Sequence, residues 1–311
     1  MSHLIISKKN EVYLIIEAEP HIYYELKDSF QFEVPNAKFS PSYKNKWWDG
    51  KIYLFNVNTK EIYVGLLDKI IQYCKDYNHT YEFKDNKFYG LPFEINENIS
   101  SEGVKDYVTS ISKHTPRDYQ IKGIYEALYH NRKVIVSPTA SGKSLMIYSL
   151  VRYYTEKENN ILIIVPTTSL VSQLYKDFVD YGWNAEEHCH LIYSGKEKED
   201  NKEVYISTWQ SLYKMPKKYF EKFNCVIVDE CHTAKAKSIV SIMTKLCDSK
   251  YRFGFTGTLD GTQTHKWVLE GLFGPSYKVT RTAELIEKGH ISKLDIRCLL
   301  LKHNPKKFET Y

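Results

Sequence analysis

The chain has 311 residues, 42% of them hydrophobic, which is enough for more than one hydrophobic core and favours two domains. No apolar run reaches the length of about 18 residues needed to cross a membrane, no signal-peptide pattern opens the sequence, and the six cysteines lack paired spacing; we therefore expect a cytoplasmic protein with no membrane partner. The formal net charge of +5 is uneven, at −3 over residues 1–110 and +8 over residues 111–311, so the second part is the better candidate for contact with phosphate groups.

Residues 1–105 predict a small α+β domain. Short apolar runs typical of strands accompany one segment with apolar residues at helical spacing. The runs lie at 12–16, 51–55 and 61–64, and the helical segment at 66–77. A polar stretch over 96–103 indicates a linker, after which Pro116 opens the next unit.

Within this domain, residues 38–51 combine basic and aromatic side chains. The segment holds four lysines and one acidic residue, interleaved with four aromatic residues. Lysines neutralise phosphates, and exposed aromatic rings stack on unpaired bases, as in proteins that bind single strands and junctions. We therefore expect nucleic-acid contacts from Lys44, Lys46 and Trp47.

A competing interpretation of the same segment needs no ligand. Asp49-Gly50 is typical of a hairpin turn. Because adjacent residues on a strand face opposite ways, we expect one of Trp47 and Trp48 to lie in the core and the other to be exposed.

After residue 132, apolar runs alternate with helix-length segments. This alternation predicts an α/β domain with a mostly parallel sheet covered by helices on both faces. The runs lie at 133–136, 161–165, 204–207, 225–228 and 252–255.

The first of these strands leads into a pattern typical of a phosphate-binding loop. Ser137 to Ser144 reads Ser-Pro-Thr-Ala-Ser-Gly-Lys-Ser, which departs from GxxxxGK[ST] only in the serine at the first glycine position. Backbone N–H groups of such a loop cradle phosphates, while the lysine reaches the β and γ phosphates and the last hydroxyl binds Mg²⁺. The expected ATP and Mg²⁺ contacts are therefore Thr139, Ala140, Ser141, Gly142, Lys143 and Ser144.

Acidic residues follow the strand at 225–228, where a P-loop protein carries its second catalytic motif. Asp229 would hold Mg²⁺ and Glu230 would act as the base for the attacking water. Taken alone, either motif could be an ordinary turn or a solvated strand end.

Together with its neighbours, Asp229-Glu230-Cys231-His232 resembles the Asp-Glu-x-His box of superfamily 2 helicases. Other boxes of that family appear in order. Segments similar to the adenine-reading element, motif Ia, motif Ib and motif III start at Arg117, Val165, Ser207 and Thr256. This resemblance predicts a RecA-like lobe over residues 106–290.

The resemblance implies roles for individual residues. Arg117 and Gln120 would read adenine, so that ATP is preferred to GTP. Nucleic-acid backbone would be held by Pro166, Thr167, Gln173 and Thr208, and coupling between the two sites would involve His232, Thr256 and Thr258.

The whole chain is also similar to the recombination helicases of T-even phages. Segments that carry this similarity lie at 30–32, 39–43 and 47–51, and again around the P-loop. The similarity implies ATP-dependent remodelling of branched or single-stranded DNA, with RNA in R-loops as a further partner, during recombination, repair and replication. Residues 1–105 would recognise DNA, and residues 291–311 would begin the connection to a second lobe, which we expect these 311 residues to lack.

The sequence leaves three alternatives open. The protein could be an RNA helicase or a double-stranded DNA translocase, because loops that grip the backbone do not read the sugar. It could also be an ATP-gated nucleic-acid-binding module with no turnover of its own. ATPase stimulation by forks, duplexes and RNA separates the first two, and a multiple-turnover assay tests the third.

Overall fold

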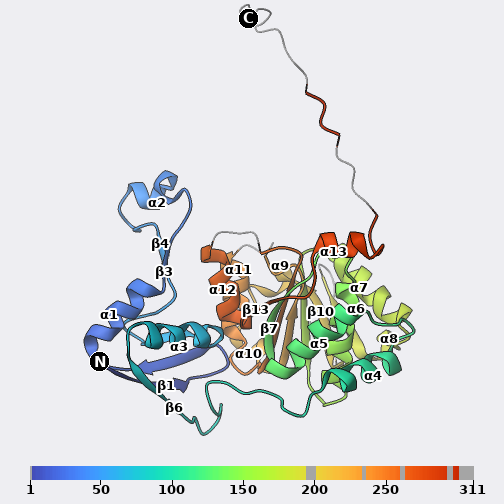
Figure 1. The fold of residues 1–311 in the computed structure, drawn as a ribbon, viewed down its shortest axis with the longest axis horizontal. Helices are drawn as coiled ribbons and strands as arrows, with labels where there is room; N and C mark the ends of the chain where they lie inside the picture. Colours follow the sequence, from blue (N-terminus) through green and yellow to red (C-terminus); the bar gives the residue numbers. More distant parts are fainter. Residues whose placement is uncertain (1, 194–200, 233–235, 260–262, 293–296, 301–311) are drawn as a thin grey trace, which may run out of the picture.

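The computed structural model describes residues 2–193, 201–232, 236–259, 263–292 and 297–300. Figure 1 shows a smaller N-terminal unit beside a larger unit built on a central sheet. Of the described residues, none belong to a helix both long and apolar enough to span a bilayer.

The N-terminal unit is the expected small α+β structure. Its mixed sheet has the order β5-β2-β1-β6, with β1 parallel to β6 and the other pairs antiparallel. Apolar residues alternate along β1, where Leu4 and Ile6 are buried, so one face of the sheet can pack against helices. The elements are β1 (His3–Lys8), β2 (Tyr13–Glu17), α1 (Pro20–Ser29), β5 (Glu61–Tyr63), η2 (Val64–Leu66), α3 (Leu67–Asp76) and β6 (Thr80–Lys84).

A long hairpin projects from this unit (Figure 1). Its strands β3 (Gln31–Glu33) and β4 (Lys51–Tyr53) pair antiparallel, and η1 (Ala37–Phe39) and α2 (Pro41–Lys44) form its tip. We call residues 34–50 the knob. The tight turn considered at Asp49-Gly50 is not formed, because these residues lie at the base of the knob rather than between two adjacent strands.

The boundary between the units lies earlier than expected. Helix α4 (Ser101–Ile111) begins inside the predicted linker at 96–103, and its Val104 and Val108 are buried in the core of the larger unit. The hydroxyl of Ser100 accepts the N–H of Gly103 at 3.0 Å, so the polar residues mistaken for a linker are a helix N-cap and first turn. A boundary at residue 105 would divide this helix.

The larger unit has the predicted RecA-like architecture. All neighbouring strands of its seven-stranded sheet are parallel, in the order β13-β7-β12-β11-β8-β10-β9. The five predicted strands are confirmed as β7 (Arg132–Val136), β8 (Ile161–Val165), β10 (Val204–Thr208), β11 (Cys225–Val228) and β12 (Tyr251–Thr256). Two short strands were missed, β9 (Cys189–Ile192) and β13 (Ser276–Lys278).

Helices cover both faces of this sheet (Figure 1). Among the described residues, the short helices of four to six residues are α8 (Ala185–His188), α9 (Trp209–Leu212), α10 (Lys217–Phe220) and α13 (Thr282–Glu287). The longer helices are α5 (Asp118–His130), α6 (Lys143–Thr155), α7 (Thr168–Asp180), α11 (Ala236–Lys245) and α12 (Gln263–Phe273).

The two units share one hydrophobic core. Trp267 on α12 packs against Phe30 and Phe32 of the N-terminal unit, with ring centroids 5.8 and 4.8 Å apart. A Cβ atom at Gly65 would lie 2.0 Å from the carbonyl oxygen of Glu270, so glycine is needed where η2 crosses α12. This close packing fixes the N-terminal unit on one face of the RecA-like lobe.

The predicted connection at 291–311 is only partly covered. Of these residues, 291–292 and 297–300 are described, and none of them is in a helix or strand. Most of the predicted connection at 291–311 lies outside the described residues.

Candidate nucleotide site and nucleic-acid interface

The P-loop joins β7 to α6 and is held by its own hydrogen bonds. Ser137 donates its backbone N–H to the carbonyl of Thr256 at 2.8 Å. The Ser141 hydroxyl donates to the carbonyl of Pro138, and the Ser137 hydroxyl lies 2.6 Å from that of Ser141. Because Ser141 has given its only hydroxyl hydrogen, Ser137 must donate to it. The serine that replaces the first glycine therefore has a structural role that the sequence did not reveal.

Gln120 lies beneath this loop. Its Nε2 donates to the carbonyl of Ser141 at 2.9 Å, and its Oε1 accepts the N–H of Arg117 at 2.8 Å. Gly142 has a φ of 77°, and a Cβ there would lie 2.3 Å from Gln120 Nε2. Both ends of the amide thus bond to backbone, and a bidentate contact with adenine would have to replace these bonds.

Lys143 and Glu230 meet across the ends of two strands. Lys143 Nζ lies 2.7 Å from Glu230 Oε1. Glu230 adopts a φ of 47°, in the left-handed region that non-glycine residues rarely occupy. Such backbone strain concentrates at functional sites.

Asp229 directly precedes Glu230 in the sequence. Burial, and next the charge of Glu230, raise the pKa of Asp229 to about 6, against the opposing effect of Lys143. One carboxylate oxygen of Asp229 accepts the N–H of Glu230 at 2.9 Å. Ser144, the other expected Mg²⁺ ligand, has its hydroxyl 2.7 Å from that of Tyr181, a partner that the motif did not indicate.

The predicted coupling residues are in contact. His232 Nδ1 lies 2.6 Å from Thr256 Oγ1, which donates to the carbonyl of Thr258 at 2.8 Å. Since the Thr256 hydroxyl has only one hydrogen, His232 Nδ1 must carry the proton that it shares. The same nitrogen lies 3.4 Å from Glu230 Oε2, so a continuous polar path leads from Glu230 to the loop at Thr258.

The motif Ia and Ib loops lie side by side because β8 and β10 are neighbours, with Val165 opposite Thr208. Gln210, which the sequence did not single out, donates to the carbonyl of Pro166 at 3.4 Å and links the two loops. Thr167 caps α7, accepting the N–H of Leu170 at 3.4 Å.

Thr208 and Gln173, which were also expected to hold the nucleic-acid backbone, differ from Pro166 and Thr167. Thr208 is buried, and its hydroxyl lies 3.1 Å from that of Ser211, so its side chain shapes the loop. Gln173 is exposed further along α7.

The knob exposes the residues predicted to contact nucleic acid. Trp47 is 81% exposed, and Lys44 and Lys46 are exposed as well. Trp48 is half-buried and donates its indole N–H to the carbonyl of Lys51 at 2.7 Å. The expectation that one of the two tryptophans is exposed is confirmed, but the expectation that the other lies in the core is wrong, because Trp48 closes the base of the hairpin instead.

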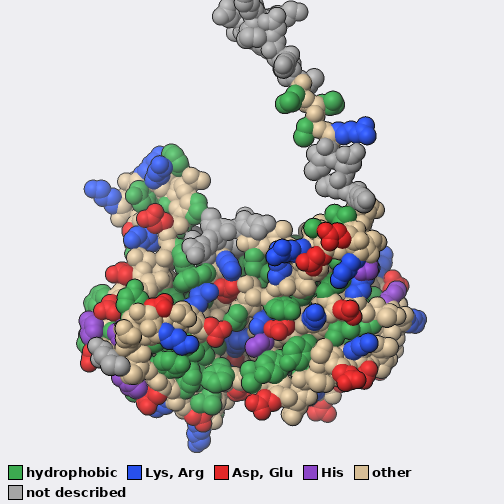
Figure 2. Space-filling model, viewed as in Figure 1, with side chains coloured by type: hydrophobic (Ala, Val, Ile, Leu, Met, Phe, Trp, Pro, Cys, Tyr) green, Lys and Arg blue, Asp and Glu red, His purple; other side chains and the backbone are tan. Residues whose placement is uncertain are grey.

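The knob lies on the side of the molecule that carries the motif loops. Figure 1 shows α2 on the same side of the molecule as α9 and α13. Helix α9 directly follows the carboxyl end of β10, so this side carries the motif loops. Figure 2 shows Lys and Arg side chains on the projecting knob.

Comparisons with known proteins match both units. Residues 6–84 fit the family model "DNA helicase UvsW, N-terminal", and residues 113–261 fit the model "Type III restriction enzyme, res subunit". The crystal structure of the UvsW helicase from bacteriophage T4 aligns with a TM-score of 0.79 at 31% identity, covering 89% of this chain and 99% of that one.

This chain belongs to the UvsW helicase family.

Two curated relatives extend the comparison. The ATP-dependent DNA helicase uvsW of Enterobacteria phage T4 is 32% identical over 306 residues, which are 95% of this chain and 59% of that protein. The DNA 3'-5' translocase XPB2 of Sulfurisphaera tokodaii is 28% identical over 225 residues, or 70% of this chain and 44% of that protein. This chain therefore spans less than two thirds of either relative.

Family membership confirms the resemblance to superfamily 2 helicases. The UvsW N-terminal model covers β3, the knob and β4. The second model covers every predicted box from Arg117 to Thr258. Both the nucleotide site and the knob thus lie within regions that the family models describe.

Proposed function

We propose that this chain is an ATP-dependent DNA helicase or translocase that remodels branched DNA, such as junctions, R-loops and forks. The observation that carries the proposal is the contact of Lys143 with Glu230. It lies at the carboxyl ends of the parallel strands, where the motif Ia and Ib loops also lie. The name of the T4 relative, an ATP-dependent DNA helicase, supports it.

ATP hydrolysis would use both members of the ion pair. We infer that Lys143 contacts the β and γ phosphates, whose oxygens are stronger acceptors for its ammonium group than one carboxylate. The Glu230 carboxylate is then available to accept the proton of the attacking water. As the water oxygen bonds to the γ-phosphorus, the bond to the β–γ bridging oxygen breaks, leaving ADP and phosphate.

The residues expected to hold Mg²⁺ fit that ion. Asp229 and Ser144 offer a carboxylate and a hydroxyl, the oxygen donors that Mg²⁺ prefers. No group of three or more His, Cys, Asp or Glu side chains able to hold a metal occurs in the part of the chain that the structure describes. Nucleotide-site Mg²⁺ needs no such cage, since one or two protein ligands and the phosphates suffice, and the ion neutralises phosphate charge.

DNA would lie on the side of the molecule shared by the motif loops and the knob. Pro166 and Thr167 would position one strand through its backbone, which gives grip without sequence readout. Lys44 and Lys46 would contact phosphates, and the exposed ring of Trp47 would stack on an unpaired base at the branch point.

Measuring how nucleic acids stimulate ATP hydrolysis tests this function. We expect forked DNA to stimulate more than linear duplex DNA of the same length, and both to stimulate more than RNA. Equal stimulation by linear duplex DNA would favour a duplex translocase over a protein that remodels branched DNA. Preferential stimulation by RNA would contradict the assignment to DNA.

A further inference from the structure

A cavity of about 430 Å³ lies between the two units. Arg132 lines it at the start of β7, whereas the P-loop follows the other end of that strand, so the cavity is remote from the ATP site. Its apolar wall comes from α3, β6 and the segment at 85–100 that leads to α4. The wall residues are Leu67, Ile71, Tyr81, Phe83 and Phe93. Figure 2 shows hydrophobic side chains gathered along this lower part of the molecule.

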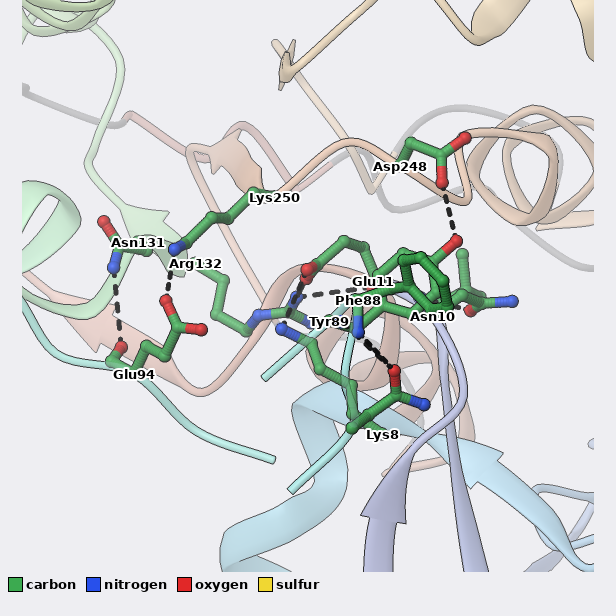
Figure 3. Close-up of polar contacts among 12 residues, drawn as sticks. Lys8, Asn10, Glu11, Phe88, Tyr89, Glu94, Asn131, Arg132, Asp248 and Lys250 are labelled. Carbon is green, nitrogen blue, oxygen red and sulfur yellow. Dashed lines mark hydrogen bonds and ion pairs between the residues drawn. The ribbon is translucent and has the colours of Figure 1, made fainter. Parts of the chain in front are cut away.

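The opposite wall carries ion pairs that join the two units (Figure 3). The carboxylate of Glu11 is shared by Lys8 Nζ and Arg132 Nη2, each at 2.8 Å from one of its oxygens. Lys8 and Glu11 are both only 4% exposed. Lys250 pairs with Glu94 beside them.

The charges around this cavity do not balance. Its lining contains four Lys or Arg residues and three Asp or Glu residues, and Asp68, one of the three, is exposed. Lys133 and His130, also in the lining, both contact Glu126. In the triad of Lys8, Glu11 and Arg132, two positive groups share one carboxylate, which is costly away from water.

Arg132 also has a free donor. Its Nη2 donates to the backbone carbonyl and to a carboxylate oxygen of Glu11, and in the part of the chain that the structure describes its buried Nη1 has no hydrogen-bond partner. A buried N–H without an acceptor is unfavourable, and such groups call for a bound water, ion or ligand. An anionic group in the cavity beside Arg132 would balance the charge of the triad.

We propose that this cavity binds a small amphiphilic anion, with a single carboxylate or sulfonate on Arg132 and an apolar body against Ile71 and Phe83. The volume falls within the range of about 300–1,000 Å³ typical of small-molecule sites. Because the two walls belong to different units, the bound ligand would hold the N-terminal unit and the RecA-like lobe together.

Fluorescence titration with 8-anilinonaphthalene-1-sulfonate tests the site, with saturating ADP and Mg²⁺ present to exclude the probe from the nucleotide site. We expect one molecule to bind per chain, octanoate to displace it and octylamine, its cationic counterpart, to leave it bound. Arg132→Lys keeps the charge but removes Nη1, and should weaken binding at least about tenfold. Equal displacement by octylamine would overturn the proposal.

Ile71→Trp provides a second variant that fills the cavity without changing its charges. Tyr24→Trp is the matched control, because Tyr24 is 62% exposed on α1 and outside the cavity. We expect the probe to lose binding to Ile71→Trp and to keep it with Tyr24→Trp. If Arg132→Lys does not fold, Ile71→Trp decides alone, and wild-type affinity in that variant means that the probe binds elsewhere and the proposal is wrong.

Discussion

Lys143 and Glu230 are 87 positions apart in the sequence and form an ion pair in the structure. Removing the ammonium group should weaken ATP binding at least about tenfold, as expected for a charge-assisted contact of about 1.5–3 kcal/mol. We predict this for Lys143→Ala by equilibrium titration with a fluorescent ATP analogue. Glu230→Gln is the matched control, since it alters the same ion pair but should retain binding; unchanged affinity in Lys143→Ala would exclude the P-loop assignment.

The role of Gln120 at the nucleotide site can be tested in the same way. Adenine reading predicts that Gln120→Ala removes the preference for ATP over GTP. The observed bonds to the backbone of Ser141 and Arg117 indicate instead that the side chain supports the P-loop. We therefore predict that Gln120→Ala weakens ATP and GTP binding by the same factor, measured by competition titration. Weakened ATP binding with unchanged GTP binding would restore the adenine-reading role.

At the scale of elements, the knob presents the clearest test of DNA contact. Lys44→Ala together with Lys46→Ala should weaken fork binding and reduce the slope of log affinity against log salt by roughly two phosphate contacts, about 0.7–0.9 each. Nucleotide affinity and melting temperature should not change. Lys84→Ala with Lys87→Ala makes the same charge change outside the knob and should leave fork binding intact. An identical loss of fork affinity in both double variants would show that the knob contributes only its charge and makes no specific contact with DNA.

Arg252 on β12 connects several elements of the RecA-like lobe. This side chain is fully buried and donates to the carbonyls of Met243, Leu246 and Leu272, each at 2.8 Å. It thereby ties the ends of α11 and α12 to the strand that leads to Thr256. Arg252→Met removes three buried hydrogen bonds and should lower the free energy of unfolding by about 3 kcal/mol or more.

Urea denaturation measures this loss. Arg152→Met is the control, because Arg152 lies on α6 with its side chain partly exposed and pairs with Glu156 at the surface; it should cost less than about 1 kcal/mol. Equal stability losses in the two variants would contradict the role assigned to Arg252.

These elements also show what the sequence could predict. Continuous apolar runs predicted the five central strands, and the P-loop and the Asp229-Glu230 pair were recognisable because their residues are adjacent in the chain. The start of α4 was misread because Ser100 and its neighbours are polar both in linkers and in N-caps. Arg252 gave no signal, since a buried arginine is indistinguishable from a surface one until its three carbonyl partners are known.

For the whole molecule, the missed features depend on contacts between distant segments. Glu11 and Arg132 are 121 positions apart, and no pattern in the sequence predicts that they share a buried cluster. The core shared between Trp267 and Phe30 likewise joins the two units. The knob and the motif loops lie on one side of the molecule (Figure 1), while the proposed ligand cavity lies at the other end of β7.

The most direct test of the central claim is ATP-dependent rearrangement of a synthetic DNA fork, followed by fluorescence energy transfer between its arms. We predict that the protein rearranges the fork only when ATP and Mg²⁺ are present, and that Glu230→Gln binds the fork but does not rearrange it. Rearrangement at the wild-type rate by Glu230→Gln, or without ATP, would show that the Lys143–Glu230 site does not drive DNA remodelling.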